Sequence, residues 1–344
     1  MRVLFLTPTK YSVGGFPVYY EQIVKALKKL GVNLYIENIR LSGKYLWDEV
    51  KSAKFFGSRL AEKYRGKVEL VHASSIVYEA FAALEVAKIL RIPSIASVHG
   101  PLIKFFKPTF KEFKSWLIHK YCTLLERKII NDIDYIIAFS RMERELLYRF
   151  YRRRHNIFVI PHGSDHTLEF ECSERVGVSS SKPNYVKGGD IVLKIAERLP
   201  HIPFIMLGPK DGFVAKVSMT KNVRYLGTVD FELHCQEMGK TKLFILPSRY
   251  DSFPITVLEA MRLGVVPIIS DRVGTKDIIR EKSAGYVLPL DLDLWTEAIN
   301  ELYASDIPSL SKKAREVALE YTWEKSANEH LKAYEFAFRN SRTV

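Results

Sequence analysis

The sequence predicts an α/β protein with two doubly wound, Rossmann-like domains. Short apolar runs alternate with amphipathic segments of helical length through most of the chain, which is typical of βαβ units and parallel sheets. This alternation occurs twice, before and after a polar stretch without a clear period at residues 163–174. A length of 344 residues also favours two domains. We therefore expect an N-terminal domain at 1–165, a C-terminal domain at 166–322 and a closing helix at 323–344.

The individual elements follow from the spacing of apolar residues. In the first half, strands are expected at residues 3–7, 32–39, 68–73, 93–99, 135–140 and 157–161, with helices at about 17–30, 46–64, 77–90, 109–131 and 141–150. In the second half, strands are expected at 175–180, 204–208, 223–227, 243–247, 265–270 and 285–288, with helices at about 189–199, 230–239, 254–263, 275–281 and 292–304. The tail, from about 308 to 340, is expected to be helical. Two such domains are expected to leave a cleft between the carboxyl edges of their sheets.

Charge is distributed unevenly along the chain. Residues 1–165 contain 28 Lys and Arg against 15 Asp and Glu, whereas residues 166–344 contain 24 of each. The whole net charge of +13 therefore lies in the first half, which indicates an anionic partner for that half: a membrane surface, a nucleic acid or an acidic acceptor. No motif for reading nucleic acid is recognisable, so we expect no nucleic-acid partner.

Cysteine use and hydropathy bear on the cellular setting. Cys122, Cys172 and Cys235 are scattered, odd in number and without metal-ligand spacing. No apolar run approaches the ~18 residues needed to span a bilayer, and the N-terminal apolar run has the pattern of a first strand. These features predict a reduced, cytoplasmic setting.

The segment PSRYDSFPITVLEAM at 247–261 contains two candidate site carboxylates. It follows an apolar run that predicts a buried strand, so its first residues lie where open α/β sheets bind ligands. Ser252 is expected to cap the following helix and Pro254 to lie in its first turn. Asp251 then lies in the loop and Glu259 inside the helix, and both can face one cleft. A turn residue and a solvated helix residue are the alternative, although the apolar residues flanking Glu259 disfavour solvation.

Two glycine-containing loops are candidate phosphate sites. Lys182 and Lys187 lie in the loop after the first strand of the second domain, and Gly188 and Gly189 start the next helix. Lysines beside a helix N-terminus can hold a diphosphate, whereas the alternative is a solvated basic loop. The pair Gly14 and Gly15 follows the first strand, where backbone N–H groups can approach a phosphate; a plain turn is equally consistent with that pair.

His99 ends an expected strand and is followed by Gly100. It could bond a sugar hydroxyl or act in proton transfer, or it could be a structural histidine bonded to nearby backbone. No cluster of His, Cys, Asp and Glu has metal-ligand spacing, so no metal site is expected.

Several segments together resemble family 4 of the retaining glycosyltransferases, which have the GT-B fold. The segment PSRYDSFPITVLEAM is similar to the family's E-x7-E motif, with Asp251 at the first acid and Glu259 at the second. The segment KPNYVKGGD is similar to its R-x4-K-G motif, with Lys182 at the arginine and Lys187 at the lysine. The segments VIPHGSD, SVHG and the helix at 324–338 also have counterparts in the family, as does the pair Gly14–Gly15.

This resemblance implies a metal-independent hexosyltransferase that moves a sugar from a UDP-, GDP- or ADP-sugar to a glycan or lipid-linked acceptor, with anomeric retention and no cofactor. It implies catalytic roles for His99, Lys187 and Asp251. It implies that the donor contacts Gly14, Gly15, Lys182, Lys187, Ser252, Phe253, Pro254 and Glu259. An inactive nucleotide-sugar-binding protein and a nucleotide-sugar 2-epimerase on the same fold remain as alternatives, although the basic pair argues against the epimerase.

Two departures from the family pattern concern the donor site. Asp251 is one methylene shorter than the family's glutamate, so its reach to the sugar is reduced. Lys182 replaces a bidentate guanidinium by a point charge, which weakens the expected grip on the diphosphate. Neither substitution removes the charge that the chemistry needs, so activity is still expected.

Basic and aromatic residues interleave at 103–121, where five lysines accompany one glutamate and alternate with Phe105, Phe106, Phe110, Phe113 and Trp116. Positions 106, 110, 113 and 117 form an apolar stripe on a helix, with Lys107, Lys111 and Lys114 beside it. A second run at 149–154 adds four arginines. A core stripe with a solvated lysine face is one interpretation. The other is an interfacial segment that docks a peripheral enzyme on anionic lipid at the inner face of the membrane.

Overall fold

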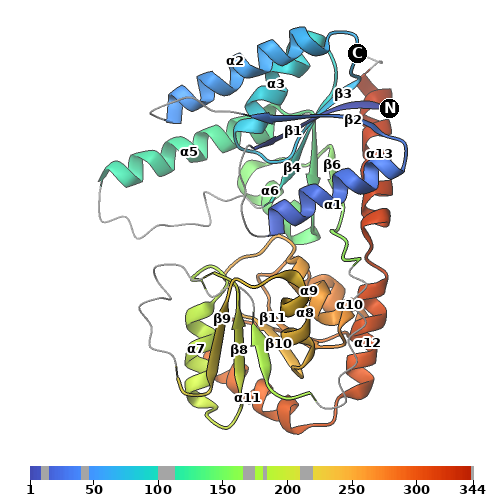
Figure 1. Cartoon of the computed structure of the whole chain (residues 1–344). Coiled ribbons are helices and arrows are strands. Elements are labelled where there is room, and N and C mark those ends of the chain that lie inside the picture. Colours follow the sequence, from blue (N-terminus) through green and yellow to red (C-terminus); the bar gives the residue numbers. More distant parts are fainter. Residues whose placement is uncertain are drawn as a thin grey trace. The chain divides into compact units, whose positions relative to one another are not determined.

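The computed structural model describes residues 1–8, 15–39, 46–99, 113–165, 175–180, 184–209 and 220–341. The chain divides into two compact units (Figure 1). Unit 1 comprises Met1–His162 together with Trp323–Val344, and unit 2 comprises Gly163–Thr322. The final helix is therefore grouped with the N-terminal residues although it follows unit 2 in sequence.

Unit 1 contains a six-stranded parallel sheet in the order β2-β1-β3-β4-β5-β6. Its strands are β1 (Arg2–Pro8), β2 (Asn33–Ile39), β3 (Leu70–Ala73), β4 (Ser94–Val98), β5 (Tyr135–Ala138) and β6 (Ile157–Val159). Its helices are α1 (Gly15–Lys29), α2 (Leu46–Tyr64), α3 (Tyr78–Leu90), α5 (Phe113–Asp132), α6 (Arg141–Tyr151) and α13 (Trp323–Ser341).

The two faces of this sheet bury different residues of the same strands, because side chains alternate along a strand. Leu4 and Leu6 join the apolar core formed with α2 and α3. Phe5, between them, contacts the ring of His72 with centroids 4.6 Å apart. Helices α1 and α13 pack together and lie side by side in Figure 1. The sheet is thus covered on both faces, as parallel sheets require.

Unit 2 contains a second six-stranded parallel sheet in the order β12-β11-β10-β7-β8-β9. Its strands are β7 (Val178–Ser180), β8 (Phe204–Leu207), β9 (Val223–Gly227), β10 (Leu243–Leu246), β11 (Val266–Ser270) and β12 (Tyr286–Leu288). Its helices are α7 (Gly189–Arg198), α8 (Phe231–Gly239), α9 (Ile255–Arg262), α10 (Lys276–Lys282), α11 (Leu292–Ala304) and α12 (Pro308–Leu319). Helix α7 packs with α11, and α9 packs with α8 and α12. Trp295 of α11 is fully buried in the core beneath α7.

These observations confirm the α/β, doubly wound fold class expected from the sequence. The expected strand and helix positions correspond to observed elements, with differences mainly at their ends, where hydrogen bonding rather than apolar spacing decides the boundary. One local expectation is wrong: α9 begins at Ile255, and Pro254 occupies the N-cap without a side-chain cap. Ser252 therefore does not cap this helix. No helix in the part of the chain that the structure describes combines the length and apolarity needed to cross a membrane.

Candidate functional site

The candidate donor site lies at the carboxyl edge of the unit 2 sheet. Strands β7 and β10 are parallel neighbours, so the loops that follow them leave the same edge. Lys187 follows β7 and Asp251 follows β10, and the Lys187 ammonium forms an ion pair with Asp251 Oδ2. The structure therefore brings together two residues that are 64 positions apart in the sequence.

Backbone geometry fixes Lys187 beside the N-terminus of α7. The Lys187 N–H donates to Asn184 Oδ1 at 2.7 Å. Gly188 has a φ of +74°, and a Cβ at this position would lie 2.0 Å from the carbonyl oxygen of Pro247. Only glycine therefore fits where this loop crosses the loop after β10. Gly189 is the first residue of α7.

Asp251 is held by the adjacent loop rather than by a regular strand. The Asp251 N–H donates to the Arg272 carbonyl at 3.2 Å, and the Asp251 carbonyl accepts from the Gly274 N–H at 2.8 Å. These bonds form a parallel bridge with Val273. The Asp251 side chain is only 10% exposed and that of Lys187 is 26% exposed. The pair is thus partly shielded from water, which strengthens its electrostatic interaction.

Glu259 lies inside α9 and is buried, at 7% exposure. Its Oε2 lies 3.8 Å from His234 Nε2 on α8. Burial raises the pKa of the neighbouring Cys235 thiol to about 12, and the Glu259 carboxylate adds to that shift. The alternative in which Glu259 is a solvated helix residue is therefore wrong. Ser252, Phe253 and Pro254, which link Asp251 to α9, are also buried.

Two candidate residues of this set, Lys182 and Gly14, lie outside the described residues. Gly15 is the first residue of α1 in unit 1. The lysines at 107 and 111 also fall outside the described ranges, and the side chain of Lys114 is not described. The expected roles of these residues stay predictions.

His99 follows β4 in unit 1 and packs among aromatic rings. Its centroid lies 4.9 Å from Tyr19, 4.6 Å from Phe139 and 5.9 Å from His162, with the two imidazoles stacked. Burial lowers the pKa of His99 to about 3. The imidazole is therefore neutral near pH 7, so it can donate or accept a hydrogen bond there but has no proton to give as an imidazolium acid.

A buried hydrogen-bond chain, which we call the α13 chain, joins α13 to the unit 1 sheet. His330 Nδ1 lies 2.8 Å from the Ser326 carbonyl, and His330 Nε2 lies 3.1 Å from Tyr19 Oη. Tyr19 Oη lies 3.1 Å from Ser97 Oγ. Ser97 Oγ lies 2.9 Å from His72 Nε2, and His72 Nδ1 lies 2.7 Å from Tyr334 Oη. Residues far apart in the sequence are thus joined in one buried network.

The carbonyl of Ser326 assigns a direction to every bond of the α13 chain. A carbonyl only accepts, so neutral His330 carries its proton on Nδ1 and accepts from Tyr19 through Nε2. Ser97 must then donate to Tyr19. It follows that His72 donates to Ser97 through Nε2 and accepts from Tyr334 at Nδ1. Each hydroxyl proton is used once, and protonating either histidine places two donors face to face.

We expect the stability of unit 1 to fall in mild acid. Burial lowers the pKa of His330 to about 4 and holds the pKa values of His72 and His162 well below 6.5. Below about pH 6.5 these histidines bind protons in the unfolded chain but stay neutral in the folded chain. Their contribution to the free energy of unfolding is therefore fully present above that pH, and it is lost as the pH falls toward their folded-state pKa values. Each such histidine contributes a slope of up to about 1.4 kcal/mol per pH unit.

Urea unfolding between pH 7.5 and pH 5 measures this slope. The variant His330→Gln removes one titrating group, and its amide oxygen can still accept from Tyr19. The pH slope of its free energy of unfolding should be smaller than that of the wild type by about 1.4 kcal/mol per pH unit. An identical slope in the wild type and the variant would show that His330 does not carry the effect.

Sequence reasoning missed the partners of the predicted residues. Arg249 lies inside the quoted 247–261 segment and Asp190 directly follows the glycine pair, yet neither was singled out. The two form a bidentate ion pair, with N–O distances of 2.7 and 2.8 Å. Their signal was position alone, since each lies within three residues of a predicted site residue. No comparable signal marked Tyr19 or His330, which lie on helices with ordinary amphipathic patterns.

Comparison with known proteins gives the same class as the fold and the site. A family model described as Glycosyltransferase Family 4 matches residues 13–168, and one described as Glycosyl transferases group 1 matches residues 170–320. The sulfoquinovosyl transferase SQD2 of Arabidopsis thaliana is 23% identical, with 93% of this chain and 70% of that protein covered.

Solved structures give the same fold. Sucrose-phosphate synthase from Thermosynechococcus elongatus superposes with a TM-score of 0.78 at 18% identity, covering 98% of this chain and 99% of the other. The Anabaena protein HepE, solved in complex with UDP-glucose, superposes with a TM-score of 0.71 at 15% identity, covering 96% and 99%.

The fold is therefore that of the GT-B glycosyltransferases. The chain belongs to glycosyltransferase family 4, of the group 1 type, as the motifs around Lys187 and Asp251 indicated. The epimerase and inactive-protein alternatives are not favoured by these matches.

Proposed function

We propose that the protein transfers a hexose, with retention of anomeric configuration, from a nucleoside-diphosphate sugar held at the carboxyl edge of the unit 2 sheet. The observation that carries this proposal is the placement of Lys187. Lys187 directly precedes Gly188, the N-cap of α7, and its ammonium is paired with Asp251 on the neighbouring loop. A cation beside a helix N-terminus suits a diphosphate leaving group, because both favour negative charge.

The geometry suggests how the reaction uses this edge. As the bond between the anomeric carbon and the diphosphate oxygen breaks, its electron pair moves to the diphosphate. Lys187 stabilises that growing charge, with Lys182 as a second cation. Asp251 lies beside the donor sugar, and Glu259 accepts hydrogen bonds from the ribose. The acceptor hydroxyl oxygen then bonds the anomeric carbon on the face that the leaving group occupied, and its proton passes to the departing diphosphate oxygen.

The remaining candidate residues have supporting roles in this proposal. The buried segment formed by Ser252, Phe253 and Pro254 sets the distance between Asp251 and α9. Backbone N–H groups at Gly14 and Gly15 bond a phosphate of the donor. The neutral imidazole of His99 bonds a sugar hydroxyl. HepE was solved with UDP-glucose, which supports a nucleoside-diphosphate sugar as the donor class, and no cofactor takes part.

Thermal unfolding against a panel of UDP-, GDP- and ADP-sugars tests the proposed donor class. A ligand that binds only the folded protein raises the unfolding midpoint by mass action, so the true donor should give the largest shift. Proton NMR of the product made from that donor then reports anomeric retention. A panel that leaves the midpoint unchanged, or a product of inverted configuration, would contradict the proposal.

We expect transfer to proceed without a divalent metal, because Lys187 and Lys182 supply the positive charge that a metal ion would otherwise supply. Turnover in EDTA should equal turnover in untreated buffer. Added Mg²⁺ or Mn²⁺ should change the rate by less than about twofold, since charge at the diphosphate is already matched. Loss of activity in EDTA that Mg²⁺ or Mn²⁺ restores would overturn metal independence.

An acceptor at an anionic membrane surface is supported by the arginine run at 149–154. Arg149, Arg152 and Arg154 are exposed at the end of α6. Arg153 differs, because its guanidinium donates to the carbonyls of Ile133 at 3.0 Å and Asp134 at 2.6 Å. Three of the four arginines can therefore meet a surface. Basic residues of this kind contribute about 1 kcal/mol each at an anionic bilayer, which suits peripheral docking at the inner face of the membrane and a lipid-linked acceptor.

Liposome flotation tests this surface. Binding to vesicles of phosphatidylserine and phosphatidylcholine should weaken as salt rises. It should fall about tenfold or more in Arg149→Glu/Arg152→Glu/Arg154→Glu, because each charge contributes on the order of 1 kcal/mol. The same three exchanges should leave binding to neutral vesicles unchanged. A wild type that does not float with anionic vesicles at low salt would favour a soluble glycan acceptor.

A further inference from the structure

Arg249 makes a dense set of contacts across the candidate donor site. Its guanidinium donates to Asp190 Oδ1 at 2.7 Å and to Asp190 Oδ2 at 2.8 Å. The same group donates to the Tyr185 carbonyl at 2.5 Å and lies 3.7 Å from the centroid of the Tyr185 ring. The backbone N–H of Arg249 donates to the Val186 carbonyl at 2.7 Å. Arg249, in the loop after β10, thus binds residues on both sides of Lys187.

These contacts enclose Lys187 from both directions along the chain. Tyr185 and Val186 precede it and Asp190 follows it, in the first turn of α7. Two residues beyond Arg249, on the same loop, Asp251 pairs with the Lys187 ammonium. The two loops are therefore joined twice, by the contacts of Arg249 and by the Lys187–Asp251 ion pair.

The Arg249–Asp190 pair, which we call the Arg249–Asp190 clamp, differs from a surface ion pair. The Asp190 side chain is 12% exposed and that of Arg249 is 26% exposed. Hydrogen bonding to Asp190 raises the pKa of Arg249, so the charge is permanent. A bidentate arginine–carboxylate pair also fixes an angle as well as a distance. Exposed ion pairs do neither well, because water screens them and their side chains keep their rotamer freedom.

We propose that the Arg249–Asp190 pair is a positioning device that sets the Lys187 ammonium against the leaving diphosphate. This inference rests on the proposed function and deepens it, by assigning work at that site to two residues that touch no reacting atom. Arg249 acts through Lys187: it anchors the loop on both sides of the lysine, so that the lysine is already in place when charge develops.

A double-mutant cycle distinguishes positioning from simple loop stability. The assay is release of the free nucleoside diphosphate from the panel sugar that most stabilises the wild type. Arg249→Met should lower kcat by about 10- to 100-fold, with the donor KM changed less than about threefold, as expected for a misplaced group. If Arg249 acts through Lys187, the double variant Lys187→Ala/Arg249→Met should be within about threefold of Lys187→Ala alone. Losses that multiply in the double variant would overturn the inference.

Two further variants sharpen the cycle. Arg249→Lys keeps the charge but loses the bidentate fork, so it should stay at least about tenfold slower than wild type. A Lys variant with wild-type kcat would show that charge alone matters, which contradicts positioning. Asp190→Asn should slow turnover as Arg249→Met does, because it removes the other half of the same pair; an Asn variant with wild-type kcat would also contradict it.

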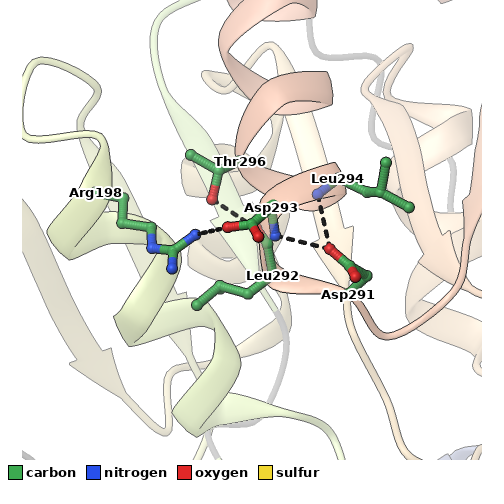
Figure 2. A network of polar contacts seen from close by, with 6 residues as sticks. All are labelled: Arg198, Asp291, Leu292, Asp293, Leu294 and Thr296. Carbon is green, nitrogen blue, oxygen red and sulfur yellow. Dashed lines mark hydrogen bonds and ion pairs between the residues drawn. The ribbon is translucent and has the colours of Figure 1, made fainter.

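The matched control lies on the same helix. Arg198, in the last turn of α7, pairs with Asp293 at the start of α11 (Figure 2), and both side chains are exposed. Arg198→Met removes an arginine ion pair from α7 without touching the Lys187 loop. Its kcat should stay within about twofold of wild type, as for an exposed pair. If Arg198→Met slows turnover as much as Arg249→Met, the effect is one of helix stability and the inference fails.

Different results would exclude the proposed function and the positioning role of Arg249. If the wild type releases no diphosphate from any panel sugar, the proposed function falls and this inference falls with it. If Lys187→Ala slows release but the Arg249 and Lys187 losses multiply, the proposed function stands and only the positioning role is overturned. Circular-dichroism melts of every variant verify that each protein compared is folded at the assay temperature.

Discussion

Replacing Lys187 with alanine is expected to lower turnover by about 10²- to 10³-fold, the usual cost of removing one preorganised electrostatic contact to a developing charge. The protein should still fold, because the Lys187 side chain is 26% exposed and the bond that Lys187 gives to Asn184 comes from its backbone N–H, which alanine keeps. Steady-state release of the nucleoside diphosphate and a thermal melt measure the two effects separately.

Lys194 provides the matched control for this substitution. It is an exposed lysine on α7, more than one helical turn beyond Lys187. Lys194→Ala removes the same charge from the same helix and should change turnover by less than about twofold, because exposed charges away from such a site act weakly. Unchanged turnover in Lys187→Ala, or equal losses in both variants, would exclude Lys187 from the reaction.

Neutralising Glu259 is expected to weaken nucleotide binding, whereas neutralising Asp251 is expected to lower turnover. Glu259→Gln should weaken free-nucleotide binding by about tenfold or more, since a hydrogen bond to a charged group contributes about 1.5–3 kcal/mol. Asp251→Asn should lower turnover by about 10²-fold, because it removes a charge beside the reacting sugar. Isothermal titration calorimetry with UDP, GDP and ADP, combined with turnover, separates binding from chemistry.

The ion pair between Lys187 and Asp251 makes the second half of this prediction specific. In the ligand-free protein Asp251 is paired with the Lys187 ammonium, so a diphosphate that binds must compete with Asp251 for it. Neutralising Asp251 removes that competitor, so Asp251→Asn should bind the free nucleotide at least as tightly as the wild type. Weaker nucleotide binding in Asp251→Asn together with unchanged binding in Glu259→Gln would reverse the two assignments.

The fold could be predicted from the sequence because it depends on local patterns. Parallel strands buried on both faces appear as short apolar runs, and the helices between them have an amphipathic period. The segment expected to be helical at 46–64 is α2 with the same bounds. The ends of strands were less certain, as at β7, which begins at Val178 rather than at 175, because a ladder ends where hydrogen-bond partners end.

The candidate site could be predicted only in outline. Lys187 and Asp251 were identifiable because each follows an apolar strand, and neighbouring parallel strands end at one edge. Their direct pairing depends on how far each side chain reaches, and the spacing of apolar residues in the sequence contains no information about that. The Arg249–Asp190 clamp joins residues 59 positions apart, and the α13 chain includes a bond between residues 311 positions apart. Such pairs are set by topology and packing, so single-sequence reasoning had no means of choosing them.

A structure of the protein bound to the nucleoside diphosphate of its preferred donor would test whether Lys187 holds the leaving group. We expect phosphate oxygens within hydrogen-bond distance of Lys187 Nζ at the N-terminus of α7. We also expect ribose hydroxyls on the Glu259 carboxylate, and Asp251 released from its ion pair. A diphosphate bound away from the carboxyl edge of the unit 2 sheet, with the Lys187–Asp251 pair intact, would contradict this role of Lys187.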